Sequence, residues 1–278
     1  MTTSELGSRS ARPQSLRVAF VGWGTIARHV AGMLKDRQKK IDVVGVATRS
    51  TLPQGGLPEG ARHLTAPVDL REVQPDLVVE AASSAAVKAW GVESLRCATG
   101  FVVSSTSAFS DDAVLQLLLK EAERCGSQIL IPSGALAGLD ALAAASRLPI
   151  DCVTHRITKP PHAWKGTPAE DLVDLEALTS AHTFFKGSAR EAASRFPANA
   201  NVAAISALAG IGFERTSVML IADPATTENC HNLTARGDFG VLNVMIENRP
   251  FAANPKSSEL AALSLVRLIE LRTQAIAI

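Results

Sequence analysis

Residues 18–30 read Val18-Ala-Phe-Val-Gly22-Trp-Gly24-Thr-Ile-Ala27-Arg-His-Val30. The apolar start predicts a strand, and the apolar residues that follow the glycines recur at helical spacing. A strand that turns through Gly-x-Gly-x-x-Ala into a helix is typical of a dinucleotide-binding unit, because the helix N-terminus offers free N–H groups to a pyrophosphate. We predict cofactor contacts at Gly22, Gly24, Thr25 and Ile26; a purely structural glycine turn is the alternative.

The end of the second predicted strand bears on the choice of cofactor. Residues 41–47 are apolar and lead into Thr48-Arg49-Ser50, where an NAD-selective unit usually places Asp or Glu against the ribose hydroxyls. Arg49 can instead pair with a 2′-phosphate. The sequence therefore favours NADP over NAD, and NAD use stays open, because a solvated loop arginine is the other interpretation of Arg49.

The first half of the chain alternates strand and helix patterns. The strand patterns lie at residues 16–21, 41–47, 77–81, 101–105 and 128–132. Such alternation predicts an α/β fold, a doubly wound, Rossmann-type parallel sheet with helices on both faces. Ser83 and Ser84 follow the third strand at its carboxyl end, where these sheets bind ligands. Ser83 is thus a candidate cofactor contact, although a tight turn explains small residues equally well.

The pattern changes from about residue 133. Strand-like runs at 153–158, 182–186, 216–222, 230–235 and 241–247 predict a second, α+β domain with a largely antiparallel or mixed sheet. Helices are predicted from a capping box at Ser188–Glu191 and over the alanine-rich residues 201–211.

The chain ends in a third helical pattern, predicted to begin in the segment 254–259 and to run through Leu271. Apolar residues on more than one side indicate a buried helix that returns to the first domain. We expect a mobile tail over 1–15, a dinucleotide-binding domain over 16–132 completed by 252–278, and a substrate and dimerisation domain over 133–251.

Composition excludes several classes of function. The 278 residues carry a formal net charge of +1 and no Lys/Arg cluster, so we expect no nucleic-acid or anionic-membrane partner. The first fifteen residues lack the apolar core of a secretory signal and no apolar run reaches membrane-spanning length, which predicts a cytoplasmic protein. The absence of tyrosine excludes the tyrosine-lysine arrangement of short-chain dehydrogenases.

The four cysteines are widely spaced, with no Cys-x-x-Cys pair. This spacing predicts reduced, mostly buried thiols and no metal site.

Five ordered segments carry a more specific signal. They are Pro132-Ser-Gly-Ala-Leu-Ala-Gly-Leu-Asp-Ala141, Lys159-Pro-Pro-His-Ala-Trp-Lys-Gly-Thr-Pro168, Phe196-Pro-Ala-Asn-Ala-Asn-Val-Ala-Ala204, Ala222-Asp-Pro-Ala-Thr-Thr-Glu-Asn-Cys-His231 and Asn254-Pro-Lys-Ser-Ser258. Together with the glycine turn, they make the chain resemble the L-aspartate dehydrogenase family from the first strand to the final helix.

The resemblance implies reversible oxidative deamination of L-aspartate to iminoaspartate, then to oxaloacetate and ammonia, with hydride transfer from C2 to a nicotinamide. It also implies a homodimer, and iminoaspartate that can feed NAD biosynthesis. It places the catalytic histidine at His231 and cofactor contacts at Ala135 and Asn201. The chain departs from the family pattern at Ala27, where a glycine is customary, and in the missing acidic residue after the second strand.

The chemistry asks for a histidine independently. An ammonium substrate must lose a proton before hydride leaves C2, and water must later be activated to attack the imine; a group that titrates near neutrality serves both steps. Without the family motif a structural role would be favoured for His231; the motif makes it the best candidate, with His162 as its main rival. His155 and His182 fall within strand patterns and are interpreted as core or surface groups.

A dicarboxylate substrate also needs cations. Lys159, just before a rigid Pro-Pro pair, and Lys256, near the start of the last helix, are the candidates, against the ordinary alternative of solvated surface lysines. Two other functions remain open: a reductase resembling homoserine or dihydrodipicolinate enzymes, and a non-catalytic NADP-binding sensor.

Overall fold

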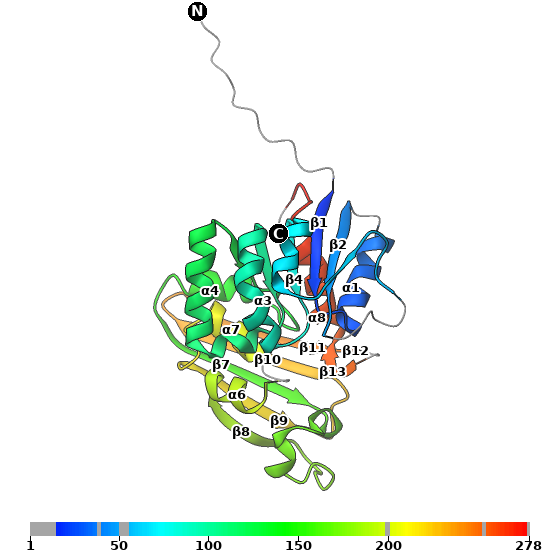
Figure 1. Ribbon diagram of the computed structural model, residues 1–278. Helices are drawn as coiled ribbons and strands as arrows, with labels where there is room; N and C mark the ends of the chain where they lie inside the picture. The colour runs from blue at the N-terminus through cyan, green and yellow to red at the C-terminus, as the bar shows by residue number, and fades with distance from the viewer. Residues whose placement is uncertain (1–14, 38–39, 50–55, 198–200, 252–253, 277–278) are drawn as a thin grey trace, which may run out of the picture.

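The computed structural model describes residues 15–37, 40–49, 56–197, 201–251 and 254–276. Figure 1 shows two main sheets, one above the other, with the amino-terminal part of the chain in the upper one. The upper sheet consists of β1 (Leu16–Val21), β2 (Ile41–Ala47), β3 (Arg62–Leu64), β4 (Leu77–Glu80), β5 (Gly100–Val103) and β6 (Gln128–Leu130). The predicted tail over residues 1–15 lies, except for Ser15, outside the described residues.

The upper sheet is doubly wound. Its order is β3-β2-β1-β4-β5-β6 with parallel pairing throughout. From β1 the chain first adds β2 and β3 on one side and then adds β4, β5 and β6 on the other. The strand order therefore switches between β1 and β4, and folds of this kind bind ligands at such a point. The five predicted strands are confirmed, and β3 was missed because it is three residues long and begins with two polar residues, Arg62 and His63.

Helices cover both faces of this sheet, as predicted. Val18 and Phe20 of β1 pack into a core with α1 (Thr25–Asp36) and α8 (Glu259–Leu271). The alternate residues of the strand, Ala19 and Val21, face the core that contains α3 (Ser84–Cys97) and α4 (Asp112–Cys125). Successive side chains of a strand point to opposite faces, so this alternation shows that β1 is covered on both faces of the sheet (Figure 1).

The lower sheet has the order β11-β10-β7-β9-β8. Its strands are β7 (Ile150–Lys159), β8 (His182–Ser188), β9 (Thr216–Ala222), β10 (Asn229–Gly237) and β11 (Gly240–Asn248). Among the strand pairs of this sheet in the described residues, only β7–β9 is parallel. The sheet is therefore mixed, which is one of the two arrangements that the sequence predicted.

One face of the lower sheet is covered by short helices. They are α5 (Leu139–Ala145), α6 (Ala189–Arg195) and α7 (Asn201–Ala209). The predicted capping box opens α6: the Glu191 carboxylate accepts the Ser188 N–H at 2.7 Å, and the Ser188 hydroxyl accepts the Glu191 N–H at 3.2 Å. The other face leaves apolar side chains of β11 in solvent, with Val241 60% and Met245 65% exposed.

The last predicted helix begins at the final residue of the segment that was expected to contain its start. Residues 254–258 form a strand, β13 (Asn254–Ser258), paired with β12 (Pro250–Phe251), and α8 starts at Glu259. The residue before a proline is biased towards extended backbone, so Pro255 opposes a helix at Asn254. As expected, α8 returns to the first sheet: Arg37, the C-cap of α1, donates to the Glu270 carboxylate at 2.6 Å, and His29 contacts Glu259 at 3.0 Å.

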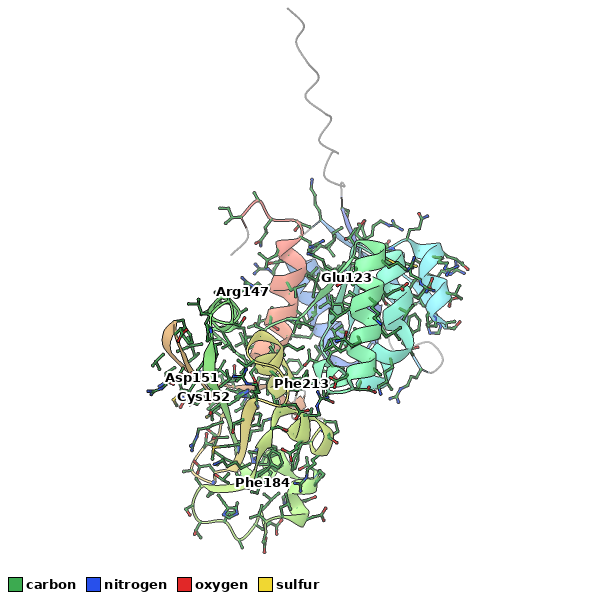
Figure 2. All side chains as sticks on the ribbon, turned by 90° about the vertical axis from the view of Figure 1, so that its left-hand side faces the viewer. Glu123, Arg147, Asp151, Cys152, Phe184 and Phe213 are labelled. Carbon is green, nitrogen blue, oxygen red and sulfur yellow. The ribbon has the colours of Figure 1, made fainter. Side chains whose placement is uncertain are left out.

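The remaining elements are short: α2 (Leu70–Val73) and the 3-10 turns η1 (Pro67–Asp69), η2 (Thr106–Ser110), η3 (Pro161–Trp164) and η4 (Pro168–Asp171). No helix in the described part of the chain is both long and apolar enough to cross a bilayer. The four cysteines are free, but the expectation that they are mostly buried is wrong. Cys152 is exposed near the start of β7 (Figure 2), and the other three are half-buried.

Candidate active site

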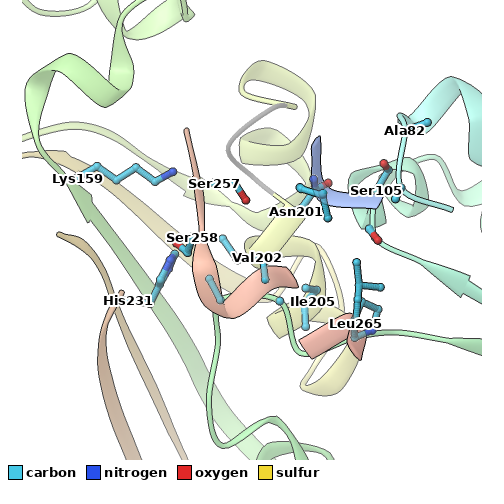
Figure 3. Close-up of a pocket in the computed structure, with 17 residues that line it drawn as sticks. Ala82, Ser105, Lys159, Asn201, Val202, Ile205, His231, Ser257, Ser258 and Leu265 are labelled. Carbon is cyan, nitrogen blue, oxygen red and sulfur yellow. The ribbon is translucent and has the colours of Figure 1, made fainter. Parts of the chain in front are cut away.

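A pocket of about 220 Å³ lies between the two sheets, where the carboxyl ends of β4 and β5 face β7, β10 and the start of α8 (Figure 3). Five residues predicted from separate parts of the sequence line it together: Ile26, Ala135, Lys159, Asn201 and His231. The other lining residues are Ala81, Ala82, Ser104, Ser105, Pro132, Gly134, Val202, Ile205, Ser257, Ser258, Ala261 and Leu265.

The glycine turn leads from β1 to the edge of this pocket. Gly22 has φ +97°, and a Cβ added there would lie 2.6 Å from the Ala82 Cβ, so only glycine fits. Gly24 is the N-cap of α1 and has no side chain to bond the first-turn N–H groups; no atom lies within 4 Å of a Cβ built on it. The helix N-terminus beside Thr25 is therefore open to a ligand.

A carboxylate that the sequence reasoning missed organises the neighbouring turns. Glu80 ends β4 and is fully buried. Its side chain accepts N–H bonds from Ala82, Ser83 and Ser105 at 2.7 to 2.9 Å, and a hydroxyl bond from Ser105 at 2.8 Å. Burial raises the pKa of Glu80, against the lowering effect of these bonds. The available signal was a carboxylate that ends the apolar run from Leu77 to Val79.

Ser83, a candidate cofactor contact, is exposed in this turn. It is the N-cap of α3, where its hydroxyl accepts the Ala86 N–H at 3.3 Å. Its neighbour Ala82 lines the pocket, whereas Ser83 is not among the lining residues. The tight-turn interpretation thus accounts for the side chain of Ser83.

Lys159 ends β7 and is only 5% exposed. Burial lowers the pKa of its ammonium group to about 8. The group lies 5.6 Å from the centre of the Trp164 ring, and Trp164 is anchored by its indole N–H, which donates to the Ile221 carbonyl at 3.1 Å. Figure 3 shows the lysine chain extended towards Ser257 at the pocket. A buried cation therefore lies at the pocket.

His231 lies on the inner face of β10 and is 2% exposed. Its Nδ1 is 3.2 Å from the Nε2 of His155 on the neighbouring strand. Burial, followed by the proximity of His155 and Lys159, holds the pKa of His231 well below its usual value, so the ring is neutral at pH 7. His155 is fully buried, so of the two predicted environments, core and surface, it occupies the core. Its contact with His231 was not predicted. The rival candidate His162 is exposed on η3 and is not among the pocket-lining residues.

Asn201 is the first residue of α7, yet its side chain bonds outside that helix. Its Oδ1 accepts the N–H of Ser107 at 3.0 Å, and its carbonyl accepts the Thr106 hydroxyl at 2.8 Å. Ala135 is held by Asn248, whose side-chain amide donates to the Ala135 carbonyl at 3.0 Å. Both predicted cofactor residues are thus fixed by bonds to distant segments.

Two predicted residues are placed away from this group. Arg49 is exposed at the carboxyl end of β2 and is not among the lining residues, and Ser50 beside it lies outside the described residues. The side chain of Lys256 also lies outside them, although its neighbours Ser257 and Ser258 line the pocket. Over the ranges that the structure describes, no group of three or more His, Cys, Asp or Glu could hold a metal ion.

Comparison with known proteins shows the family of the chain. The family model "Aspartate dehydrogenase, C-terminal" matches residues 140–272, and the model "Homoserine dehydrogenase, NAD binding domain" matches residues 22–132. An L-aspartate dehydrogenase of Brucella anthropi is 49% identical over 256 residues, which cover 92% of this chain and 96% of that protein. The chain belongs to the L-aspartate dehydrogenase family.

Other members of the L-aspartate dehydrogenase family match over almost their whole length. The protein of Cupriavidus necator is 41% identical over 95% of this chain and all of its own. The crystal structure of aspartate dehydrogenase from Thermotoga maritima superposes with a TM-score of 0.76, at 26% identity, over 95% of this chain and 99% of that one. A hyperthermophilic archaeal homoserine dehydrogenase in complex with NADPH, with a TM-score of 0.61, is 11% identical over 95% of this chain and 99% of its own, and shows the fold alone. The predicted family and fold class are confirmed, and the chain is an oxidoreductase with an NAD-binding domain.

Proposed function

We propose that this chain catalyses the reversible, NAD(P)-dependent oxidative deamination of L-aspartate to iminoaspartate, which water converts to oxaloacetate and ammonia. The observation that carries the proposal is the pairing of a buried neutral imidazole, His231, with a buried cation, Lys159, in one pocket next to a dinucleotide-binding turn. A zwitterionic dicarboxylate carries an ammonium proton that must be removed and carboxylates that must be bound. The neutral imidazole can accept the proton, and the ammonium group of the lysine can bind a carboxylate.

The residues around the turn fit a dinucleotide. Gly24 leaves open space at the N-terminus of α1, where backbone N–H groups and Thr25 receive the pyrophosphate. Ile26, Ala135 and Asn201 then face the nicotinamide end, since they line the same pocket as His231. A dinucleotide held there would supply an oxidised nicotinamide as the acceptor for the hydride of aspartate C2.

His231 performs the proton transfers. Its neutral ring takes one proton from the aspartate ammonium group, which frees the nitrogen lone pair to form the C=N bond as the hydride leaves C2. After that proton passes to solvent, the ring takes a second one from the water that attacks the imine carbon. Return of this proton to nitrogen lets ammonia leave, while the freed ring takes the remaining proton of the added hydroxyl group, so that the C=O bond of oxaloacetate forms.

Lys159 holds a substrate carboxylate. Its ammonium group is desolvated, so an ion pair formed there is stronger than one in water. We place Lys256 as the second cation on sequence grounds, because it precedes Ser257 and Ser258 at the start of α8. Two fixed carboxylates would orient C2 for hydride transfer.

The finer assignments are also proposals. NADP is the preferred cofactor because Arg49 is exposed at the end of β2 with no acidic residue beside it, and NAD is the second. Ser83 would approach the cofactor only through its backbone, since its side chain caps α3. The domain boundaries given above, a cytoplasmic location and a contribution of iminoaspartate to NAD biosynthesis stay predictions.

A homodimer is supported by the uncovered face of the lower sheet. Val241 and Met245 of β11 are largely exposed there. Exposed apolar side chains on an edge strand are typical of a protein–protein interface. A second copy of the chain is the proposed occupant.

The experiment follows reduced-nicotinamide absorbance while the protein is mixed with oxaloacetate, ammonium and NADPH or NADH. Ammonium-dependent oxidation that disappears in His231→Ala supports the proposal, and the faster cofactor tests the NADP preference. Absence of oxidation in folded, nucleotide-binding protein contradicts it. Homoserine and a cyclic imine, supplied in parallel, test the other reductase activities, and nucleotide binding without any turnover indicates a sensor.

A further inference from the structure

His231 is the end of a chain of buried polar groups that leads away from the pocket. Its Nδ1 is 3.2 Å from the Nε2 of His155. The Nδ1 of His155 is 3.1 Å from the hydroxyl oxygen of Ser206, and that hydroxyl donates to the Ala203 carbonyl at 2.9 Å. His155, Ser206 and Ala203 are completely buried, so no solvent replaces any member.

Strand register produces the central contact. In the antiparallel pair of β7 and β10, His231 lies opposite Ile157 and His155 lies opposite Leu233. Residues opposite each other share a face, and so do residues two apart on one strand. The two histidines are therefore diagonal neighbours on the inner face of the sheet, where α7 brings Ser206 against them.

Proton counting selects one arrangement of this chain. Neutral His231, neutral His155 and Ser206 each carry one exchangeable proton on the side chain. The three contacts, His231–His155, His155–Ser206 and Ser206–Ala203, each need one proton. The Ala203 carbonyl can only accept, so Ser206 must donate to it. His155 must then donate from Nδ1 to Ser206 and accept at Nε2, which leaves His231 to donate from Nδ1. The reverse order leaves the 2.9 Å contact between the Ser206 and Ala203 oxygens without a proton.

We infer that His155 and Ser206 are positioning residues that hold His231 in its Nδ1–H tautomer, with the basic Nε2 lone pair left for the substrate. No described residue makes a hydrogen bond to His231 Nε2, whereas the ring lines the pocket. In the other tautomer Nε2 carries a proton and cannot accept one from the ammonium group or from water. The inference deepens the proposed function, and rests on it for the role of His231.

The neutral state of the partner supports this arrangement. Burial lowers the pKa of His155 to about 3, so its Nε2 remains an acceptor throughout the pH range of ordinary enzymes. The acceptor is a neutral imidazole, not a carboxylate, and the imidazolium formed on His231 is therefore weakly stabilised. It returns its proton readily to the departing nitrogen.

The first test reads the tautomer directly in the wild-type protein. Long-range ¹H–¹⁵N spectra of ¹⁵N-histidine-labelled protein distinguish a protonated from an unprotonated ring nitrogen, and spectra of His155→Gln and His231→Gln assign the signals. We expect His231 as the Nδ1–H form at pH 7. Observation of the Nε2–H form, which free histidine favours in water, overturns the inference. This measurement does not require catalytic turnover. Its outcome is therefore independent of whether aspartate is the substrate.

The second test uses paired variants. His155→Leu removes the acceptor and should shift His231 to the Nε2–H form and lower kcat about 10- to 100-fold, by analogy with the loss of second-layer partners of functional histidines. The dissociation constant of the cofactor should change less than about twofold. His155→Gln can accept from His231 and donate to Ser206 at once, so it should retain the Nδ1–H form and most of kcat. His182→Leu, on an exposed residue of β8, is the control.

Thermal unfolding identifies any variant that does not fold. In that case Ser206→Ala, which removes one oxygen atom, replaces His155→Leu, with a smaller expected loss of about three- to tenfold in kcat and the same shift of tautomer. A folded His155→Leu or Ser206→Ala protein with unchanged kcat and an unchanged His231 tautomer contradicts the inference.

Discussion

The backbone N–H of Ser107 donates a 3.0 Å hydrogen bond to the side-chain oxygen of Asn201, 94 residues further along the chain. The bond joins η2, which follows strand β5 of the upper sheet, to α7, which covers the lower one. It leaves the Asn201 amide group beside the pocket, close to the ends of β4 and β5 (Figure 3). One side chain thus connects the two halves of the molecule at the place proposed for the nicotinamide.

Replacement of Asn201 by alanine should weaken cofactor binding about tenfold, because a bond between the two halves and a donor at the pocket are lost together. Isothermal titration with NADP and NAD measures the change. Asn243→Ala, which removes a side chain from the exposed edge strand β11, is the matched control and should bind normally. Equal affinities of the two variants would show that Asn201 has no part in the cofactor site.

The two glycines of the turn should fail in different ways. Gly22→Ala forces a side chain into positive φ and against Ala82, so we expect the free energy of unfolding to fall by about 1–3 kcal/mol. Gly24→Ala meets no protein atom within 4 Å and should unfold like the wild type while binding cofactor at least tenfold more weakly. Chemical denaturation and nucleotide titration separate these effects. Normal nucleotide affinity in a folded Gly24→Ala protein would contradict the pyrophosphate assignment.

Arg49 tests the preference for NADP. Loss of a charge-assisted bond to a 2′-phosphate costs about 1.5–3 kcal/mol, so Arg49→Ala should raise the KM for NADP about 10- to 100-fold and leave that for NAD within twofold. Arg236→Ala, an exposed arginine at the far end of β10, should change neither value. A similar rise for both cofactors would remove Arg49 from the 2′-phosphate site.

Lys159 should impose an alkaline limit on substrate capture. Because burial lowers its pKa to about 8, the side chain is a cation below that pH and a neutral amine above it. At saturating ammonia, kcat/KM for oxaloacetate should therefore fall about tenfold per pH unit above pH 8.

Lys159→Met should remove this limit and raise the KM for oxaloacetate at least tenfold at pH 7. Lys165→Met, on an exposed lysine paired with Glu176, should keep the wild-type profile. A wild-type profile in Lys159→Met would exclude the lysine as the carboxylate cation.

The open face of the lower sheet tests the homodimer. Met245→Glu introduces a charge at a residue that is 65% exposed in the single chain, so it should unfold normally but shift the mass measured by light scattering towards one chain. Leu117→Glu, at a 54% exposed position of α4, is the control and should remain dimeric. A dimer that survives Met245→Glu would place the interface elsewhere.

Local patterns in the sequence determined the secondary structure of the functional core. The apolar run of β1, the helical spacing of α1 and the capping box at Ser188 are each patterns that extend over a few neighbouring residues. The glycine turn and the Glu-Asn-Cys-His231 segment, from which the family resemblance predicted His231, are local signals as well. The start of α8 at Glu259 lies within the predicted segment, whereas the short strand over residues 254–258 that precedes it was not predicted.

Only the tertiary structure decided which of these residues meet. His155 and His231 are 76 residues apart and touch because β10 pairs with β7 in one particular register. The burial of Glu80 depends likewise on the loop after β5, which brings Ser105 to its carboxylate. Such contacts arise from strand order and register, which pack distant segments to bury apolar surface. A short stretch of sequence determines which face a side chain occupies, and the fold determines what it finds there.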